Sequence, residues 1–148
     1  RVLFRSKADA LARQIASTFS STASNYLGLS VPESEDPAAN FMLEVAMTHF
    51  AVESNPGGVH ATVGARFRII DRKSGTIVWE DRWNRATVIA SNPYEPGSST
   101  EWVLAAANAG KMAALSGKEL QEAFKTAAQR VGDAAADGLR SDVASVAK

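Results

Sequence analysis

The sequence predicts an α+β fold in which an antiparallel sheet of three long strands packs against helices from both ends of the chain. Three observations lead to this prediction. Residues 59–69 alternate between apolar and polar positions, residues 55–58 and 71–75 have the composition of tight turns, and segments near both chain ends repeat apolar residues at helical spacing. Strands joined by such short turns must be antiparallel neighbours, so the sheet is a meander.

Length and composition limit the class of protein. The 148 residues fit a single domain, with 45% hydrophobic and 22% charged residues. Lys plus Arg and Asp plus Glu each number 16, and this balance counts against nucleic-acid binding, which normally needs a basic excess. The absence of cysteine excludes disulfides and thiolate metal sites. Because the chain starts at Arg1, a signal peptide or lipidation cysteine could lie upstream.

An N-terminal helix is predicted over residues 7–25, with Ser6 as its N-cap. Its apolar residues recur every three or four positions and therefore lie on one stripe. They are Ala8, Leu11, Ala12, Ile15, Ala16, Phe19 and Ala23. Residues 2–4, which precede this helix, could supply a fourth, short strand.

The first long strand is predicted over residues 41–53, where β-branched and aromatic residues are frequent. Proline-containing loops are predicted before the first strand, over residues 28–40, and after the third, over residues 91–99. Strict alternation places Phe41, Leu43, Val45 and Met47 on one face. The other face then carries Met42, Glu44, Thr48, Phe50 and Val52, so it is only partly polar.

The second strand has the clearest pattern in the chain. Its apolar residues are Val59, Ala61, Val63, Ala65, Phe67 and Ile69, each separated from the next by one polar residue or glycine. We therefore expect the last four of these to be buried, and Arg66 and Arg68 to be exposed on the opposite face. Gly75 suits the left-handed position of the following turn, and the third strand spans residues 76–90.

Two helices are predicted after the sheet. Residues 102–115 are rich in alanine, and Ser116 with Glu119 has the spacing of a capping box that opens a longer helix. Gly132 and Gly138 lie inside this longer helix. Each is expected to weaken it by ~1 kcal/mol relative to alanine.

The sequence predicts no catalytic residue, no cofactor and no metal site. His49 and His60 could approach each other across the first hairpin and, with Glu53, form a thinkable metal site, but the spacing matches no known motif. No Gly-x-Ser-x-Gly elbow or phosphate-binding loop is present. The adjacent acids Glu80 and Asp81 point to opposite faces of a strand and cannot act together.

Arginines give the sheet a basic face. Arg66 and Arg68 project from one side of the second strand, and Arg82 is expected near them on the third. One interpretation is a solvated face on which Glu44 and Glu80 are cross-strand partners. The other is a docking surface for an acidic partner or a lipid headgroup.

Two tryptophans share a face of the third strand. Trp79 and Trp83 are four residues apart, so they either pack in the core or form an exposed aromatic patch. Tryptophan is enriched in binding hot spots, and an interface is therefore the second interpretation.

The edges of the sheet favour association. No proline lies inside any predicted strand, and charges are sparse in the first one, so unpaired edge groups could pair with another chain. The Ala-rich face around residues 105–109 offers a second surface. We therefore expect self-association or a stable complex with a partner subunit.

Residues 41–85 resemble part of two families of bacterial envelope lipoproteins. Residues 42–50 read Met-Leu-Glu-Val-Ala-Met-Thr-His-Phe, residues 66–71 read Arg-Phe-Arg-Ile-Ile-Asp, and residues 74–79 read Ser-Gly-Thr-Ile-Val-Trp. The order of these segments is similar to that in ABC-type transport auxiliary lipoproteins and in the periplasmic domain of curli-secretion lipoproteins. The segment formed by residues 91–116 departs from this resemblance, because it is longer than the corresponding segment expected in the auxiliary lipoproteins.

This resemblance implies a non-enzymatic, periplasm-facing domain of an outer-membrane lipoprotein. Such a domain would serve envelope transport or assembly by binding other envelope proteins. The alternative is a small-molecule or lipid-binding module, with an apolar pocket between sheet and helices floored by Phe50, Phe67 and Trp79. An enzyme that uses His49 and His60 is the third hypothesis and ranks last.

Overall fold

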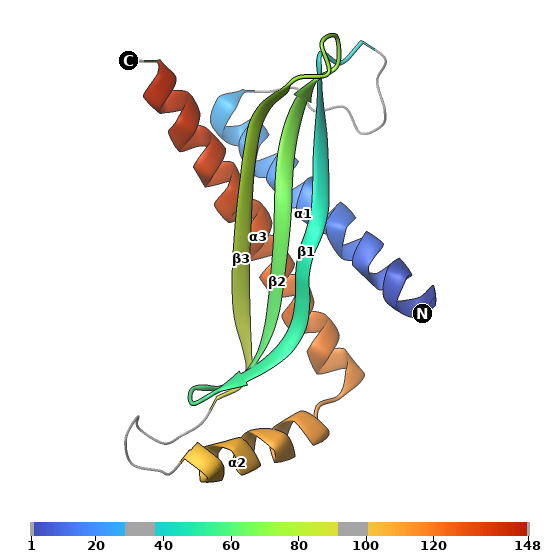
Figure 1. Cartoon of the computed structure of the whole chain (residues 1–148), viewed down its shortest axis with the longest axis vertical. Coiled ribbons are helices and arrows are strands. Elements are labelled where there is room, and N and C mark those ends of the chain that lie inside the picture. Colours follow the sequence, from blue (N-terminus) through green and yellow to red (C-terminus); the bar gives the residue numbers. More distant parts are fainter. Residues whose placement is uncertain (1, 29–37, 92–100, 148) are drawn as a thin grey trace.

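The computed structural model describes residues 2–28, 38–91 and 101–147. Its elements are α1 (Val2–Leu27), β1 (Phe41–Asn55), β2 (Gly58–Asp71), β3 (Ile77–Ser91), α2 (Glu101–Ala113) and α3 (Gly117–Val146). The predicted α+β class and antiparallel meander are confirmed, with β2 as the central strand (Figure 1). The two predicted loops fall largely outside the described residues.

The second hairpin is closed by the Asp71 carboxylate. It accepts hydrogen bonds from the backbone N–H groups of Lys73, at 2.8 Å, and Ser74, at 2.9 Å. The bonds to Ser74 and Lys73 hold the pKa of Asp71 below its ordinary value. Gly75 completes the turn with φ +71°, the left-handed conformation predicted for it.

β1 contains a bulge at Thr48 that strict alternation does not predict. The pairing of β1 with β2 shifts by one residue there, so the side chains change faces. Phe50 and Val52 consequently lie on the same face as Met47 and pack against the core. The prediction that Phe50 and Val52 lie on the opposite face is wrong for this reason.

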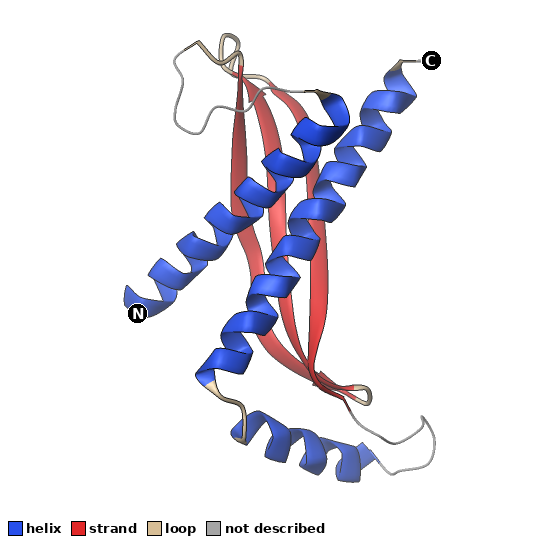
Figure 2. Ribbon diagram, turned by 180° about the vertical axis from the view of Figure 1, so that it is seen from behind, coloured by secondary structure: helices blue, strands red, loops and turns tan. Residues whose placement is uncertain are grey.

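α1 and α3 lie side by side across one face of the sheet and run in the same direction (Figure 2). α1 already begins at Val2, so residues 2–4 and Ser6 are helical. The expected fourth strand and the expected N-cap at Ser6 are therefore wrong. Helical spacing extends back from Ala8 to Phe4, which explains why the helix continues through this segment.

The two long helices make close backbone contact at Gly132. A Cβ atom at this position would lie 2.9 Å from the Ile15 carbonyl oxygen and 3.1 Å from the Phe19 nitrogen. Thr22 also donates a hydrogen bond to Asp133 across this contact, at 2.8 Å. The glycine expected only to weaken α3 is therefore what allows α1 to approach it.

The core lies between these helices and the sheet. Phe67 and Ile15 are fully buried, and the rings of Phe19 and Phe67 are 5.3 Å apart. Val63 and Ala65 are buried as predicted, whereas Ile69 is only partly buried.

The remaining helix packs across one end of the sheet. Asn108 of α2 donates a hydrogen bond to the carbonyl of Asn55 at 2.8 Å, and Lys111 donates one to the carbonyl of Ser91 at 2.6 Å. The C-terminal half of α2 is thus held against the last residues of β1 and β3. The predicted capping box of Ser116 and Glu119 opens α3.

Truncation of the central aromatic residue tests the assignment of the sheet faces. Phe67→Ala should lower the free energy of unfolding by about 3–5 kcal/mol, because it removes a fully buried ring. Phe41→Ala is the matched control, since Phe41 is 55% exposed and should change it little. Urea denaturation measures both. Equal effects of the two substitutions would contradict the assignment.

A pair of glycine substitutions tests the helix contact. Gly132→Ala should destabilise the protein by about 1–3 kcal/mol, because the added methyl meets backbone atoms of α1. Gly110→Ala in α2 should be stabilising by up to ~1 kcal/mol, since nothing lies within 4 Å of the added atom. Thermal denaturation compares them. Stabilisation by both variants would show that α1 does not approach α3 as described.

Candidate functional site: the open face of the sheet

No described element covers the face of the sheet turned away from α1 and α3, which we call the open face (Figures 1 and 2). Its side chains form rungs, each with one residue from every strand. We name three neighbouring rungs near the middle of the sheet. The charged rung is Glu44, Arg68 and Glu80, the arginine rung is Ala46, Arg66 and Arg82, and the glycine rung is His49, Gly64 and Asn84.

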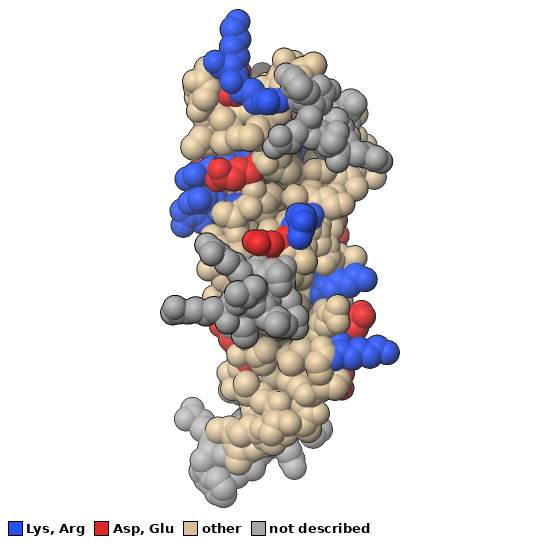
Figure 3. All heavy atoms as spheres, turned by 90° about the vertical axis from the view of Figure 1, so that its right-hand side faces the viewer, with Lys and Arg blue, Asp and Glu red and all other residues tan. Residues whose placement is uncertain are grey.

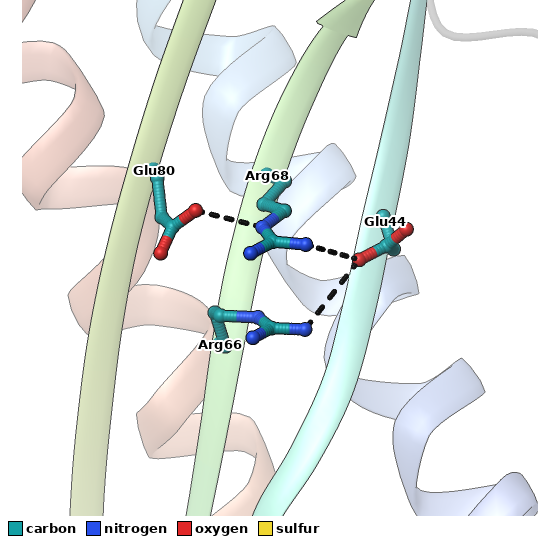
Figure 4. A network of polar contacts seen from close by, with 4 residues as sticks. All are labelled: Glu44, Arg66, Arg68 and Glu80. Carbon is teal, nitrogen blue, oxygen red and sulfur yellow. Dashed lines mark hydrogen bonds and ion pairs between the residues drawn. The ribbon is translucent and has the colours of Figure 1, made fainter. Parts of the chain in front are cut away.

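The charged rung holds one arginine between two glutamates. Arg68 Nε donates to Glu80 Oε2 at 2.7 Å, and Arg68 Nη1 lies 3.5 Å from Glu44 Oε1 (Figure 4). The hydrogen bond from Arg68 holds the pKa of Glu80 below its ordinary value. The cross-strand partners predicted from sequence, Glu44 and Glu80, therefore do pair with an arginine of β2.

The arginine rung lacks such compensation. Arg66 and Arg82 are directly opposite each other on neighbouring strands, and the third member is Ala46. Arg66 reaches only Glu44 of the next rung, at 3.8 Å, and its buried Nε has no hydrogen-bond partner among the described residues. Like charges directly opposite each other are unfavourable in a sheet.

A hollow lies beside the arginine rung. Gly64 has no side chain, and a Cβ atom there would overlap the amide oxygen of Asn84 and lie 3.0 Å from Thr48 Oγ1. The hollow has a volume of about 520 Å³. It is lined by Thr48, His49, Glu53, Thr62, Arg82 and Asn84.

The polar groups of this hollow are not arranged for nucleophilic catalysis. Glu53 lies between Thr62, which donates to it at 2.7 Å, and His49, whose Nε2 lies 2.9 Å from its other oxygen. A catalytic triad instead places the histidine between the acid and the hydroxyl. The bonds from Thr62 and His49 lower the pKa of Glu53, which favours its ionised form.

The two histidines have separate partners. His60 Nε2 lies 3.0 Å from the side-chain oxygen of Asn55, whereas His49 contacts Glu53. Within the described residues no group of three or more His, Cys, Asp or Glu side chains could hold a metal ion.

The five residues named as a candidate interaction surface are divided between the two faces. Arg66, Arg68 and Arg82 lie on the open face, where the side chains of Arg66 and Arg68 are partly buried and not exposed as predicted. Trp79 and Trp83 lie on the helix face, half-buried. There the indole N–H of Trp79 donates to Asp142 at 2.9 Å, and that of Trp83 donates to Asp81 at 2.8 Å.

Aromatic rings occupy the position of the predicted apolar pocket. Phe50 stacks on Phe124 of α3 with ring centroids 4.1 Å apart. Trp79 stacks on Phe19 of α1 at 5.9 Å, and the same Phe19 ring contacts Phe67. The three residues expected to floor a pocket are therefore in direct contact with the helices above them.

Apolar side chains are exposed at the end of the open face nearest the second hairpin. Met42, Ile70 and Ile77 are opposite one another on the three strands. Met42 is 47% exposed and Ile77 45%. We call these three residues the apolar rung.

The outer strands have free edges within the described part of the chain, because only β2 pairs with β1 and β3. Helix side chains contact two carbonyls of β3, through Arg130 to Ala86 at 3.2 Å and Lys111 to Ser91. Figure 3 shows the side of the molecule on which β1 is the outer strand, where charged side chains stand in small separate groups. Self-association through this edge remains a prediction.

The sequence prediction missed Gly64, Asn84 and Thr48 as parts of the site. A glycine inside a strongly alternating strand marks a close approach, and this signal was available for Gly64. Thr48 enters the site only because of the bulge, which strict alternation does not predict.

Similarity to known proteins is found among solved structures. No protein-family model matches the chain, and no curated protein matches it in sequence. A solved structure of a protein provisionally described as a lipoprotein, from Caulobacter crescentus, aligns with 88% of this chain and 81% of its own. Its sequence identity is 14% and its TM-score 0.44.

A second solved structure is the lipoprotein GNA1162 from Neisseria meningitidis. It aligns with 50% of this chain and 49% of its own, at 17% identity and a TM-score of 0.30. Both similar proteins are described as bacterial lipoproteins. At these sequence identities and TM-scores the similarity does not indicate the function of this chain. No helix in the described residues combines the length and apolar composition of a membrane span.

The charged rung makes stability depend on pH. The pKa of Glu80 is lowered because Arg68 binds its ionised form, so the carboxylate stabilises the fold above the ordinary glutamate pKa of about 4.3. This contribution is lost as the pH falls through the lowered pKa. Glu80→Gln should therefore reduce the free energy of unfolding near neutral pH, and the difference from the native chain should shrink as the pH falls through the lowered pKa of Glu80.

Urea denaturation at several pH values measures this difference. Glu122→Gln is the control, because it removes the same charge from the exposed side of α3. A destabilisation by Glu80→Gln that stays constant over the whole pH range would contradict the ionic origin of the contribution.

Proposed function

We propose that this chain is a non-catalytic protein-binding domain of a bacterial envelope lipoprotein, and that its partner docks on the open face. The observation that supports this most strongly is the asymmetry of the sheet. α1 and α3 bury one face, whereas the other, on strands of 14 and 15 residues, is covered by no described element.

The open face has the composition of a non-obligate interface. It combines the exposed apolar rung with ordered polar groups, and the side chains of Arg66 and Arg68 are only 27% exposed. Such interfaces are about as polar as the rest of a protein surface, and exposed apolar patches commonly mark binding sites. Ordered side chains also lose less conformational entropy when a partner binds.

The envelope part of the proposal is supported by the resemblance of residues 41–85 to periplasm-facing outer-membrane lipoproteins that serve transport or assembly. The non-catalytic part is supported by the arrangement of His49, Glu53 and Thr62, in which the acid separates the histidine from the hydroxyl.

Site-specific photocrosslinking in the native host tests the docking face. A photoreactive phenylalanine analogue replaces Ala86, exposed on the open face, or Gln129, exposed on α3, in the full-length protein. We expect a defined protein adduct from position 86 in the envelope fraction and none from position 129. The crosslinked protein, once purified, should bind the native domain, and the open-face substitution Met42→Asp, which places a charge in the apolar rung, should weaken that binding.

Two outcomes would contradict the proposal. Equal adducts from positions 86 and 129 would show that the open face is not the docking surface. Recovery of the full-length protein outside the envelope fraction would refute the envelope assignment. An adduct with a second copy of the chain would identify self-association as the interaction.

A further inference from the structure

Of the three named rungs, the arginine rung alone carries arginines without a carboxylate of its own. The charged rung places one arginine between two glutamates, and the glycine rung has no arginine or carboxylate. The arginine rung places Arg66 against Arg82 with only alanine beyond them. Within the described residues the guanidinium of Arg82 makes no hydrogen bond and no ion pair, and Glu80 acts on it only through a longer-range charge interaction.

The space beside Arg82 is suitable for an anionic group. The hollow over Gly64 adjoins Arg82, and Asn84 and Thr48 bring an amide and a hydroxyl to it. Glu53 also lines the hollow, and its two carboxylate oxygens are engaged by His49 and Thr62, so the Arg82 end is the part that suits an anion. Guanidinium groups bind carboxylates through paired, charge-assisted hydrogen bonds. An anion seated here would also relieve the repulsion between Arg66 and Arg82.

We propose that the arginine rung and the adjoining hollow over Gly64 bind the carboxylate of an acidic side chain from the partner protein. This inference rests on the proposed docking on the open face. A protein source is favoured over a free anion by the shape of the site. The hollow opens onto an uncovered sheet, where a small anion stays largely hydrated and exposed ion pairs contribute little. A partner that covers the face excludes that water and strengthens the interaction.

The apolar rung indicates which second residue of the partner would bind next to the acidic one. The apolar rung and the arginine rung are separated by four residues along β1, from Met42 to Ala46. At strand rise this corresponds to about 13 Å. An extended partner segment that lies along the sheet therefore matches this pattern when an apolar and an acidic residue are four positions apart and on the same side.

Peptide titration followed by NMR tests the inference on the 148-residue chain. The probe is acetyl-Ile-Thr-Ser-Thr-Glu-Thr-amide, and its control has Gln in place of Glu. We expect the Glu peptide to shift the Nε–Hε signals of Arg66 and Arg82 and the amide signal of Gly64. The Gln peptide should bind at least about fivefold more weakly, because the charge-assisted bond is lost.

Three variants locate the effect. Arg82→Gln should weaken binding of the Glu peptide at least about fivefold and leave the Gln peptide unchanged. Gly64→Ala should have a similar effect without a change in charge, because the Asn84 side chain must move into the hollow. Arg13→Gln removes an exposed charge of α1 on the other side of the sheet and should have little effect. Thermal melts verify that each variant is folded.

Equal binding of the two peptides, or an unchanged affinity in Arg82→Gln, would overturn the inference. Inorganic phosphate and phosphatidylglycerol vesicles are titrated in parallel. Stronger shifts of Arg66 and Arg82 with either of them than with the Glu peptide would also overturn it, in favour of a free anion or a lipid surface. A position-86 protein adduct together with failure of these titrations would leave the docking face intact and refute only the carboxylate site.

Discussion

The approach of α1 to α3 at Gly132 is the contact on which the rest of the structure depends. A bare backbone at this position lets the two long helices lie against each other, with the Ile15 carbonyl next to Gly132. Together they bury Phe67 and the other inward residues of β2, which neither helix could cover alone. The cost of glycine in a helix is about 1 kcal/mol, small beside the core that this contact closes. Gly138 has a related position, close to Asp81 and Trp83 of β3.

Because both long helices lie on the same side, the two faces of the sheet have different roles. The helix face takes the aromatic residues, including Trp79 and Trp83, and satisfies both indole N–H groups with carboxylates. The open face takes the arginines, and only one of them is placed between two acids. The bulge at Thr48 serves both faces, since it returns Phe50 to the core and brings His49 beside Gly64. The candidate site therefore follows from how the core is built.

Much of the fold could be predicted because short-range patterns determine it. Alternation in β2 correctly identified the buried face, and the residues of both hairpin turns and of the Ser116 capping box have the expected local conformation. The Thr48 bulge was missed, although the apolar positions change from odd before Met47 to even at Phe50. The role of Gly132 depends on a helix more than a hundred residues away, and no local pattern contains that information. Alternation could place the arginines on one face. That Arg82 forms no ion pair depends on the register of all three strands and could not be predicted from a local pattern.

The central claim is that the open face binds a protein while surfaces away from it stay exposed to solvent. Hydroxyl-radical footprinting tests it most directly, because two exposed methionines report on different parts of the surface. Met42 lies on the open face and is 47% exposed, and Met112 lies on α2 and is 39% exposed. The oxidation rates of both are compared between the purified chain and the full-length protein in native envelopes. The account predicts that Met42 is protected in the envelopes while Met112 keeps its rate. An unchanged rate at Met42, or equal protection of both methionines, would contradict it.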